Sequence, residues 1–339
     1  MSIDVIIGGQ GGDESKGNTA AYLSLYGDYS VCLRVSAPQA GHSIYINGKK
    51  IGLAQLPTGV INPHMRVLMG AGSLISVEKV LREIRETGAN PENVGIDYRA
   101  TIVSPEHLAK EKEDEYLMKS IGSVGTGVSA CRIDKIMRRI DLKFAKDIPE
   151  LEPYLTDTKR ELIHVLENSS NILLEGDHGA KLDLIHGEYP KVTTRAVNAA
   201  GFLSEAGIGP KYVREVYVIL KPYTTRVGPG PLENEIFNKA HLKWGFESGG
   251  ELGSVSKRKR RMGEFEWKQV SNVIKQNSAT KLVFSHMDWF NSDEAKREER
   301  TAEKFLAEVN ERLCSNFPYP KIALLSYGPN TEDVKPFGN

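Results

Sequence analysis

Several features that mark specialised protein classes are scarce in this chain of 339 residues. Its three cysteines, Cys32, Cys131 and Cys314, are widely spaced and odd in number. Such a set excludes a disulfide framework and a CxxC metal site, and it is typical of a reducing cytoplasm. An excess of charge of one sign is also absent, because 44 Lys and Arg balance 44 Asp and Glu. The balance argues against nucleic-acid binding through bulk positive charge.

Long hydrophobic runs are absent as well. Apolar runs such as residues 5–7 and 172–174 fall far short of the roughly 18 apolar residues that a membrane span needs. The first residues lack a basic segment and pass directly into a strand pattern, so no signal peptide is expected. With 40% hydrophobic residues and a mean hydropathy of -0.35, the chain is predicted to be globular, cytoplasmic, and without a membrane or nucleic-acid partner.

What the sequence does contain is an alternation of buried-strand and helix patterns. Short apolar, β-branched runs predict strands at residues 3–7, 31–35, 67–69, 172–174, 216–220, 282–284 and 322–325. Helical spacing predicts helices at residues 19–26, 76–87 and 302–315. This order predicts an α/β fold with a large, mostly parallel sheet flanked by helices, like that of P-loop NTPases. Ligands bind such sheets beyond the carboxyl ends of the strands.

The first strand runs into a glycine-rich loop, residues 8–17, with the sequence GGQGGDESKG. Glycines followed by a lysine at a helix start let backbone amides surround a phosphate. The spacing matches neither GxxxxGK[ST] nor GxGxxG, and a tight turn with a surface lysine is the alternative. Asp13 favours the first interpretation, because a carboxylate beside phosphate must bind Mg²⁺ or take a proton from the substrate.

Two further segments have both a purely structural and a functional interpretation. His42, in the loop Pro38-Gln39-Ala40-Gly41-His42-Ser43, is by itself more typical of a hydrogen-bonded structural histidine than of a catalytic one. The basic run at residues 257–261 is either a solvated face, a nuclear-localisation patch or an anion-binding loop.

Together the glycine-rich loop, residues 8–17, and the loop that contains His42 resemble the GDEGKG and NAGH motifs of the adenylosuccinate synthetase family. Further family motifs follow in the same order, at residues 56–59 (LPTG), 134–139 (DK with RR), 174–176 (LEG), 189–193 (YPKVT), 225–231 (TRVG and GP), 258–263 (RKRRMG) and 326–329 (SYGP). The match covers nearly the whole chain and is most similar to the short archaeal-type members. It implies one domain over residues 1–339, with loop excursions from the sheet forming the active site.

The resemblance implies a C–N ligase that joins L-aspartate to C6 of a purine nucleotide. In that chemistry Asp13 removes the N1 proton, and the resulting O6 oxyanion takes the γ-phosphate of a nucleoside triphosphate. The aspartate amine then displaces this phosphate. His42 is implied as the general acid, and Mg²⁺ is implied as the cofactor, held by Asp13 and the Gly41 carbonyl. A lysine and backbone amides are expected to keep Asp13 ionised.

The resemblance also implies three sets of binding residues. For the purine nucleotide they are Asp13, Glu14, Ser15, Lys16, Gln39, Ala40, Gly41, His42, Ser123, Val124, Arg138, His178, Thr193 and Arg258. For L-aspartate they are Ser254, Val255, Ser256, Arg258 and Arg260. For the triphosphate they are Gly12, Lys16, Gly17, Gly41, His42, Ser43, Arg260, His286, Asp288, Ser326 and Gly328. Arg138 matches an arginine that reaches the neighbouring subunit's substrate, which implies a homodimer.

The departures from the family pattern fall on substrate-facing positions. They are Gly11 for Trp, Ser15 for Gly, Gln39 for Asn, Ser123-Val124 for Thr-Thr, Asp177-His178 for Ala-Gln or Thr-Gln, residues 254–257 for ATTG, and residues 285–288 for TKxD. Retained catalytic residues with altered base-reading positions resemble the viral 2-aminoadenylosuccinate synthase branch, which acts on dGMP. A host-cytoplasmic enzyme using dGMP and ATP or dATP is therefore expected. The alternatives are an enzyme using IMP and GTP, and a nucleotide-binding regulatory protein without catalysis.

Overall fold

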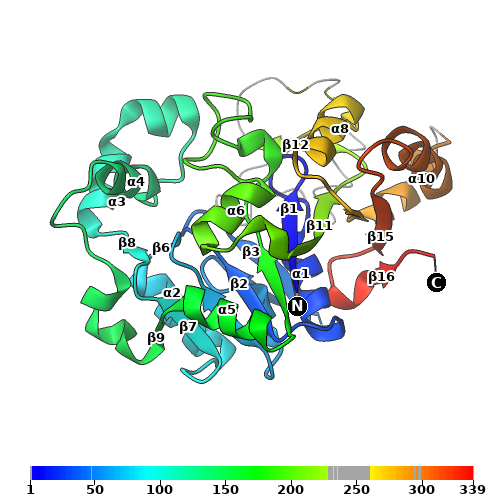
Figure 1. The fold of residues 1–339 in the computed structure, drawn as a ribbon. Coiled ribbons are helices and arrows are strands. Elements are labelled where there is room, and N and C mark those ends of the chain that lie inside the picture. The colour runs from blue at the N-terminus through cyan, green and yellow to red at the C-terminus, as the bar shows by residue number, and fades with distance from the viewer. Residues whose placement is uncertain are drawn as a thin grey trace.

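A large, mostly parallel β-sheet runs through the centre of the protein (Figure 1). The computed structural model describes residues 2–46, 48–227, 232, 235, 260–292, 295–296 and 299–338. The sheet has ten strands in the order β16-β15-β14-β11-β1-β10-β2-β5-β7-β9. Their bounds are β1 Ser2–Gly8, β2 Val31–Arg34, β5 Arg66–Met69, β7 Val94–Asp97, β9 Leu155–Thr156, β10 Asn171–Glu175, β11 Val213–Leu220, β14 Lys281–Phe284, β15 Lys321–Ser326 and β16 Val334–Pro336. Only the pairing of β15 with β16 is antiparallel among these neighbours.

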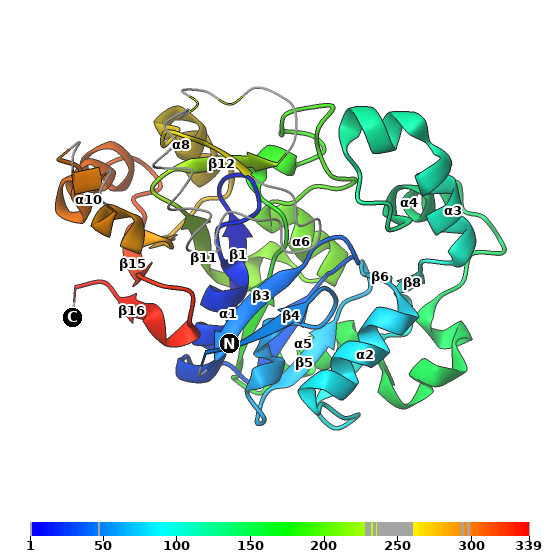
Figure 2. The same ribbon diagram turned by 180° about the vertical axis from the view of Figure 1, so that it is seen from behind.

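Both faces of the sheet are buried, because successive residues of each strand enter different cores. Val5 and Ile7 of β1 belong to one hydrophobic cluster, whereas Ile6 between them belongs to the other. The first cluster includes residues of α5 (Thr158–Glu167), α6 (Ala199–Ala206), α8 (Trp267–Gln276) and α10 (Ala302–Val309). The second includes residues of α1 (Lys16–Tyr26) and α2 (Val77–Thr87). Accordingly, α5 and α6 lie before the sheet in Figure 1, and α2 lies before it in the reverse view of Figure 2.

Smaller elements surround the sheet. Three two-stranded sheets pair β3 (His42–Ile46) with β4 (Lys49–Leu53), β6 (Leu74–Ile75) with β8 (Thr101–Ile102), and β12 (Thr224–Val227) with β13 (Arg260–Gly263). Helices α3 (Pro105–Glu113) and α4 (Val128–Ile136) form a lobe to one side, at the left of Figure 1. Short 3-10 or π-helical turns occur at Thr58–Ile61, Tyr116–Ile121, Ala145–Asp147, Pro149–Tyr154, Ala180–Leu182, Pro210–Tyr212, Met287–Asn291, Asn310–Cys314 and Thr331–Asp333. No helix in the described part of the chain is long and apolar enough to cross a membrane.

The predicted α/β fold with a large, mostly parallel sheet is confirmed, and the differences lie at helix ends. The helix predicted from residue 19 begins at Lys16, because Ser15 adopts a left-handed conformation (φ 61°) that ends the loop directly before it. The helix predicted over residues 302–315 is α-helical only to Val309 and continues as a π-helical turn, Asn310–Cys314. Apolar periodicity does not separate these two helical forms, because both bury one face.

Candidate active site

The loop after β1 is organised around the side chain of Glu14. Its Oε1 accepts hydrogen bonds from the backbone amides of Gln10 (2.9 Å) and Gly12 (2.8 Å), and its Oε2 pairs with Lys16 Nζ at 2.7 Å. Glu14 and Lys16 are both buried. Two backbone amides of the loop and its lysine therefore already bind the carboxylate of a residue in the same loop. That a phosphate is held here by the same groups stays a prediction.

Glycines let three other segments approach this loop closely. A Cβ at Gly8 would lie 2.5 Å from the His178 carbonyl oxygen, and a Cβ at Gly17 would lie 2.8 Å from His42 Cβ. At Gly11 a Cβ would lie 2.7 Å from the carbonyl oxygen of Thr225 in β12. The loops that follow β1, β2 and β10 therefore meet at the carboxyl edge of the sheet, as predicted. Gly11 faces the backbone of β12, so a larger residue there would displace that strand.

Asp13 lies at the centre of this cluster with its two carboxylate oxygens in different surroundings. Oδ2 accepts hydrogen bonds from Lys221 Nζ (3.0 Å) and from the Thr225 hydroxyl, and it forms an ion pair with Arg260 Nε at 3.0 Å. Oδ1 is buried and has no hydrogen-bond partner among the described residues. Burial alone would raise the pKa of Asp13, but the charges of Lys221 and Arg260 outweigh it and hold this pKa well below its usual value. Asp13 is therefore ionised, with one oxygen left to accept a proton or bind a cation.

Lys221, which directly follows β11, is the lysine expected to keep Asp13 ionised. Gln10 fixes its backbone, because Gln10 Oε1 accepts from the Lys221 amide (2.9 Å) and Gln10 Nε2 donates to the Lys221 carbonyl oxygen (3.2 Å). Sequence reasoning anticipated such a lysine without locating it. The available signal was a lysine directly after a buried apolar strand, since the carboxyl end of a parallel strand is where ligand-facing residues lie.

Oδ1 of Asp13 is also the strongest indication of where Mg²⁺ would bind. Mg²⁺ is usually held by one or two carboxylates together with substrate phosphates and water. Among the described residues no group of three or more His, Cys, Asp or Glu side chains converges on one point, so a cage built by the protein alone is not present there. The orphaned Oδ1 fits the sparse protein ligation that this ion prefers.

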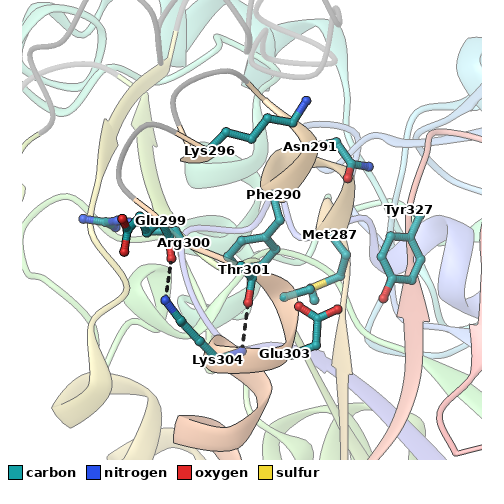
Figure 3. A pocket seen from close by; sticks show the side chains of 11 residues that line it. Met287, Phe290, Asn291, Lys296, Glu299, Arg300, Thr301, Glu303, Lys304 and Tyr327 are labelled. Atoms are coloured by element: carbon teal, nitrogen blue, oxygen red, sulfur yellow. Dashed lines mark hydrogen bonds between the residues drawn. The ribbon is translucent and has the colours of Figure 1, made fainter.

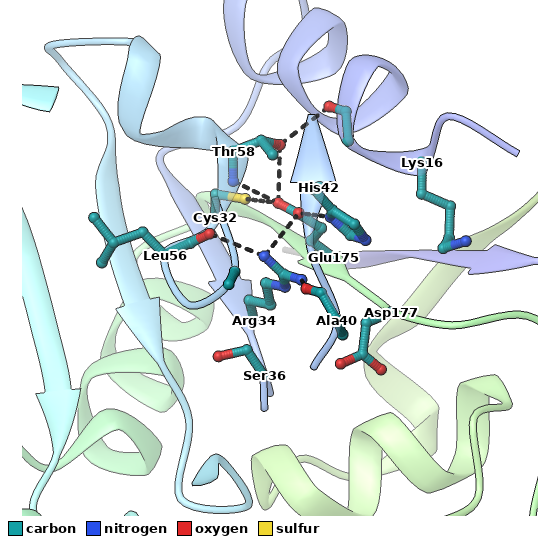
Figure 4. A network of polar contacts seen from close by, with 12 residues as sticks. Lys16, Cys32, Arg34, Ser36, Ala40, His42, Leu56, Thr58, Glu175 and Asp177 are labelled. Atoms are coloured by element: carbon teal, nitrogen blue, oxygen red, sulfur yellow. Dashed lines mark hydrogen bonds and ion pairs between the residues drawn. The ribbon is translucent and has the colours of Figure 1, made fainter. Parts of the chain in front are cut away.

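His42, the first residue of β3, is held by a buried carboxylate at the end of β10 (Figure 4). His42 Nδ1 lies 2.5 Å from Oε1 of Glu175. The other carboxylate oxygen of Glu175 accepts from the amide (2.7 Å) and hydroxyl (2.9 Å) of Thr58. Arg34 Nη1 lies 3.8 Å from Glu175 Oε1, and Arg34 also donates to the Ala40 carbonyl oxygen at 2.6 Å. The imidazole is therefore fixed in position and orientation.

This network sets the protonation of His42. Burial and the nearby charge of Arg34 lower the pKa of His42 to about 4, against the opposing effect of Glu175. At neutral pH the ring is uncharged, with its proton on Nδ1 directed at Glu175 and a lone pair on Nε2. Nε2 is buried without a partner among the described residues. A general acid at this position must therefore acquire its second proton when the anionic substrates bind.

Sequence reasoning placed Glu175 and Arg34 only within motifs or strands and gave them no role. The signal was present in both cases. Arg34 is the last residue of the otherwise apolar strand β2, and Glu175 ends the apolar strand β10. Charged residues are almost never fully buried unless they are paired. A charged residue in a buried strand therefore predicts a partner of opposite charge on a neighbouring strand.

His178 belongs to a second buried network, three residues beyond the end of β10. Its Nδ1 lies 2.9 Å from Oδ1 of Asp177, which also pairs with Arg195. Arg195 further donates to the Glu205 carboxylate (2.5 Å) and to the Val35 carbonyl oxygen (2.7 Å). Burial opposes ionisation of Asp177, but Arg195 holds its pKa well below the usual value. Asp177 and Arg195 were not predicted as partners.

The residues expected to bind the triphosphate base follow β14 and β15. His286 adopts a left-handed conformation (φ 58°), and its Nδ1 lies 2.9 Å from the Ser285 hydroxyl, which contacts the Glu14 carbonyl oxygen at 3.0 Å. Burial and Lys221 lower the pKa of His286 to about 3, so its ring is uncharged at neutral pH. Burial, reinforced by Asp333, raises the pKa of Asp288 to about 6. Around His286 and Asp288 burial therefore favours the uncharged forms, whereas Asp13 is held in its charged form.

A cavity of about 630 Å³ opens between the turn after β14, the start of α10 and the end of β15 (Figure 3). Met287, Phe290 and Tyr327 form its apolar part, and Lys296 and Glu303 are among its charged lining residues. Met287 directly precedes Asp288, and Tyr327 lies between Ser326 and Gly328. Ser326 Oγ donates to the Gly328 carbonyl oxygen at 3.1 Å. The cavity thus adjoins the residues that the sequence assigned to the triphosphate base.

Other predicted site residues lie away from Asp13 or outside the described part of the chain. Ser123 hydrogen-bonds Glu111, Val124 is exposed, and Arg138 (φ 54°) follows α4. Within the described part of the chain, no hydrogen bond or ion pair joins these three residues to Asp13. Thr193 donates its amide to the Leu182 carbonyl oxygen at 2.8 Å. Gln39, Ala40, Gly41 and Ser43 surround His42 in sequence at the start of β3. Ser254, Val255, Ser256 and Arg258 lie outside the described residues.

The sheet, the glycine-rich loop and the convergent buried charges at its carboxyl edge define a nucleotide-binding α/β enzyme. The family model "Adenylosuccinate synthetase" matches residues 5–146 and 142–296. The adenylosuccinate synthetase of Pyrococcus sp. (strain ST700) is 36% identical over 338 residues, covering 97% of each chain. That of Methanococcus maripaludis (strain DSM 14266) is 34% identical over 342 residues, covering 98% of each.

Two solved structures share the fold. Fully ligated adenylosuccinate synthetase from Plasmodium falciparum superimposes with a TM-score of 0.87, at 23% identity, over 98% of this chain and 99% of that one. The succinoaminodeoxyadenylate synthetase of cyanophage S-2L, bound to dGMP and dATP as an energy donor, gives a TM-score of 0.83, at 23% identity, over 100% and 96%. The chain belongs to the adenylosuccinate synthetase family and is a C–N ligase.

Proposed function

We propose that this enzyme joins L-aspartate to C6 of dGMP, giving 2-amino-2'-deoxy-N6-succinoadenylate for diaminopurine nucleotide synthesis. The reaction is driven by hydrolysis of ATP or dATP and passes through a 6-phosphoryl purine. The observation that carries the proposal is the asymmetry of Asp13: three cationic or hydroxyl groups occupy Oδ2, and Oδ1 is left without a described partner. An ionised, oriented carboxylate with one vacant oxygen suits the removal of a proton from purine N1.

The reaction has two steps, phosphorylation of O6 and its displacement by the aspartate amine, and residues of this chain assist them. Asp13 Oδ1 accepts the N1 proton, and the electron pair moves to O6, which attacks the γ-phosphorus as the β–γ bridging bond breaks. The aspartate amine then adds to C6, and the C6–O6 bond breaks as phosphate leaves with the purine oxygen. His42, positioned by Glu175, stabilises charge on the transferring phosphoryl group. Mg²⁺, held by the Asp13 carboxylate and the Gly41 carbonyl, would neutralise phosphate charge when bound.

Arg260 has a further part in this proposal. It pairs with Asp13 in the structure, although the sequence assigned it to aspartate and to the triphosphate. Its forked guanidinium is suited to carboxylate and phosphate groups. We place it on these substrates during turnover. Its departure from Asp13 then removes one of the charges that lower the pKa of this carboxylate, and Asp13 becomes a stronger base once the site is filled.

dGMP is proposed as the purine substrate because guanine keeps the N1–H and O6 that the chemistry needs, while the base-reading residue is changed to His178. The cyanophage enzyme of the same fold is named for binding dGMP. IMP is the second candidate, favoured by the adenylosuccinate synthetases of archaea that are 34–36% identical over nearly the whole chain. The two substrates differ at purine C2, where guanine has an amino group.

ATP or dATP is proposed as the energy donor because of the cavity beside Asp288. Met287, Phe290 and Tyr327 offer apolar surface on which a purine ring stacks. With its pKa raised to about 6, Asp288 takes up a proton more readily than an ordinary aspartate. A protonated carboxyl can donate to N1 of adenine and accept from its 6-amino group. Guanine, in contrast, needs the ionised form, because its N1 and N2 are both donors.

A homodimer completes the proposal. Ile133, Ile136, Met137 and Ile140, on α4 and the turn after it, are all exposed, and Arg138 lies among them. Several large apolar side chains exposed together are typical of a protein–protein interface. A second copy on this face would allow Arg138 to reach the partner's nucleotide. Light scattering is expected to show a dimer, and a monomer at assay concentration would contradict this part of the proposal.

The test is turnover of the purified protein with L-aspartate and Mg²⁺, using dGMP or IMP as acceptor and ATP, dATP or GTP as donor. Product from dGMP with ATP or dATP is expected to exceed all other combinations. Product from IMP alone would overturn the dGMP assignment, and GTP as clearly the best donor would overturn the adenine assignment. Asp13→Asn should abolish turnover while circular dichroism stays unchanged. Phosphate release at background with every combination would favour a non-catalytic nucleotide-binding protein.

A further inference from the structure

His178 occupies an unusual position beside the catalytic loop. Its backbone is left-handed (φ 55°), and a Cβ on Gly12 would lie only 3.2 Å from the carbonyl carbon of His178 and from the amide nitrogen of Gly179. Gly12 directly precedes Asp13. The His178–Gly179 peptide therefore packs against the residue directly before the candidate general base Asp13, so the His178 side chain originates at the edge of the proposed purine site.

The carboxylate beside His178 is fixed and already neutralised. Asp177 is fully buried, and its Oδ1 is shared between His178 Nδ1 (2.9 Å) and the guanidinium of Arg195. The Arg195 side chain is 4% exposed, donates to Glu205 and to the Val35 carbonyl oxygen, and lies over the Phe202 ring. Neither partner can rotate away without leaving a buried charge unpaired, which is costly.

This arrangement determines which ring nitrogen of His178 holds the proton. Nδ1 faces a carboxylate, which only accepts, so Nδ1 must donate. Because Arg195 already balances the charge of Asp177, the carboxylate needs no second cation, and the neutral imidazole suffices. Its lone pair then lies on Nε2. No described residue hydrogen-bonds Nε2, and the side chain is 10% exposed.

We propose that the Asp177–Arg195 ion pair holds His178 as an Nε2 acceptor that selects purines carrying a 2-amino group. The inference rests on the proposed function, and it names the chemical group that decides between its two candidate substrates. The amino group of guanine has two N–H donors. One lies on the N1 side, toward Asp13, and the other is left to be read by a separate acceptor. Hypoxanthine has only C2–H there and leaves Nε2 unpaired, and a site built for a hydrogen bond rejects an analogue that lacks it. His178 contacts the base in this proposal, and Asp177 and Arg195 are positioning residues.

The experiment compares dGMP with dIMP, which differ only in the 2-amino group. For the wild-type enzyme, kcat/KM with saturating ATP, Mg²⁺ and aspartate should be at least about tenfold higher for dGMP, the ratio expected from one hydrogen bond. His178→Phe keeps a ring of similar size but removes the acceptor. Its dGMP-to-dIMP ratio should fall about tenfold, through loss of dGMP activity alone. His178→Gln supplies an amide oxygen and should restore most of the ratio.

Controls separate selection from structure. His64→Phe, at an exposed histidine before β5, should leave the ratio unchanged. Should His178→Phe fail to fold, ¹⁵N chemical shifts of the wild-type imidazole provide the second measurement: Nδ1–H is expected, and an Nε2–H tautomer would overturn the proposal. An unchanged ratio in His178→Phe would also overturn it, while dGMP turnover by the wild type would leave the proposed function standing. Wild-type turnover of dIMP and IMP but not dGMP would instead overturn the proposed function itself, and the selection by His178 with it.

Discussion

Two histidine–carboxylate pairs have their carboxylates, Glu175 and Asp177, two residues apart at the end of β10, and they differ in burial and partners. His42 Nδ1 meets Glu175 at 2.5 Å, and the imidazole Nε2 is enclosed beside the start of α1. His178 Nδ1 meets Asp177 at 2.9 Å, and the ring is partly exposed at the edge of the loop. Each carboxylate has its own arginine, Arg34 or Arg195. In the function proposed above, the same residue types orient one ring toward phosphate chemistry and the other toward the purine base.

Substitutions in the two histidine–carboxylate pairs are expected to change different kinetic quantities. Glu175→Gln removes the charge that holds His42 and should lower kcat by about 100-fold or more for every purine, within the range for a general acid–base group. The ratio of kcat/KM for dGMP and dIMP should not change, because we propose that His178, not His42, selects the purine. Steady-state kinetics with both substrates measures this. A changed ratio with an unchanged kcat would show that the two pairs do not divide the work in this way.

The arginine of the second pair is expected to matter chiefly for stability. Arg195→Met leaves the fully buried Asp177 without its cation, a kind of change that costs about 3–5 kcal/mol. Urea unfolding followed by circular dichroism would measure the loss. Arg214→Met is the control, because Arg214 also pairs with a buried aspartate, Asp4, but its own side chain is 47% exposed, so it should cost less. Equal costs for the two variants would contradict the assignment of Arg195 to a buried, unscreened pair.

Asp288 differs from Glu175 and Asp177, because no arginine among the described residues forms an ion pair with it. Burial and Asp333 raise the pKa of Asp288 from 3.8 to about 6, so the native state binds its proton more tightly than the unfolded chain does. The free energy of unfolding of wild type relative to Asp288→Asn should therefore fall as pH rises from about 4 to 6, and stay level above. The fall should not exceed about 2 kcal/mol after allowance for partial exposure. A relative stability that rises over this interval would contradict the raised pKa.

The sequence was sufficient for the fold and for the motif residues, but not for the partners that orient them. Apolar runs such as residues 172–174 define strands because a parallel sheet is buried on both faces. The loop holding Asp13 was recognisable because glycine and acid follow such a strand. Lys221 and Arg195 were not predicted as partners, because sequence separation hides both pairs. Lys221 lies roughly 200 residues from Asp13, and Arg195 lies roughly 20 residues from Asp177. Pairing across a sheet depends on strand order. The local sequence of Arg195 contains no sign of Asp177.

In the proposed mechanism, O6 of the purine is phosphorylated after Asp13 takes the N1 proton. This step is tested most directly by turnover of [6-¹⁸O]dGMP with L-aspartate, Mg²⁺ and unlabelled ATP, followed by mass spectrometry of the phosphate released. The account predicts that each phosphate formed carries the purine oxygen, because the C6–O6 bond breaks when the amine displaces it. Unlabelled phosphate together with the succinylated product would show that the purine oxygen never reaches phosphorus, and would contradict the account.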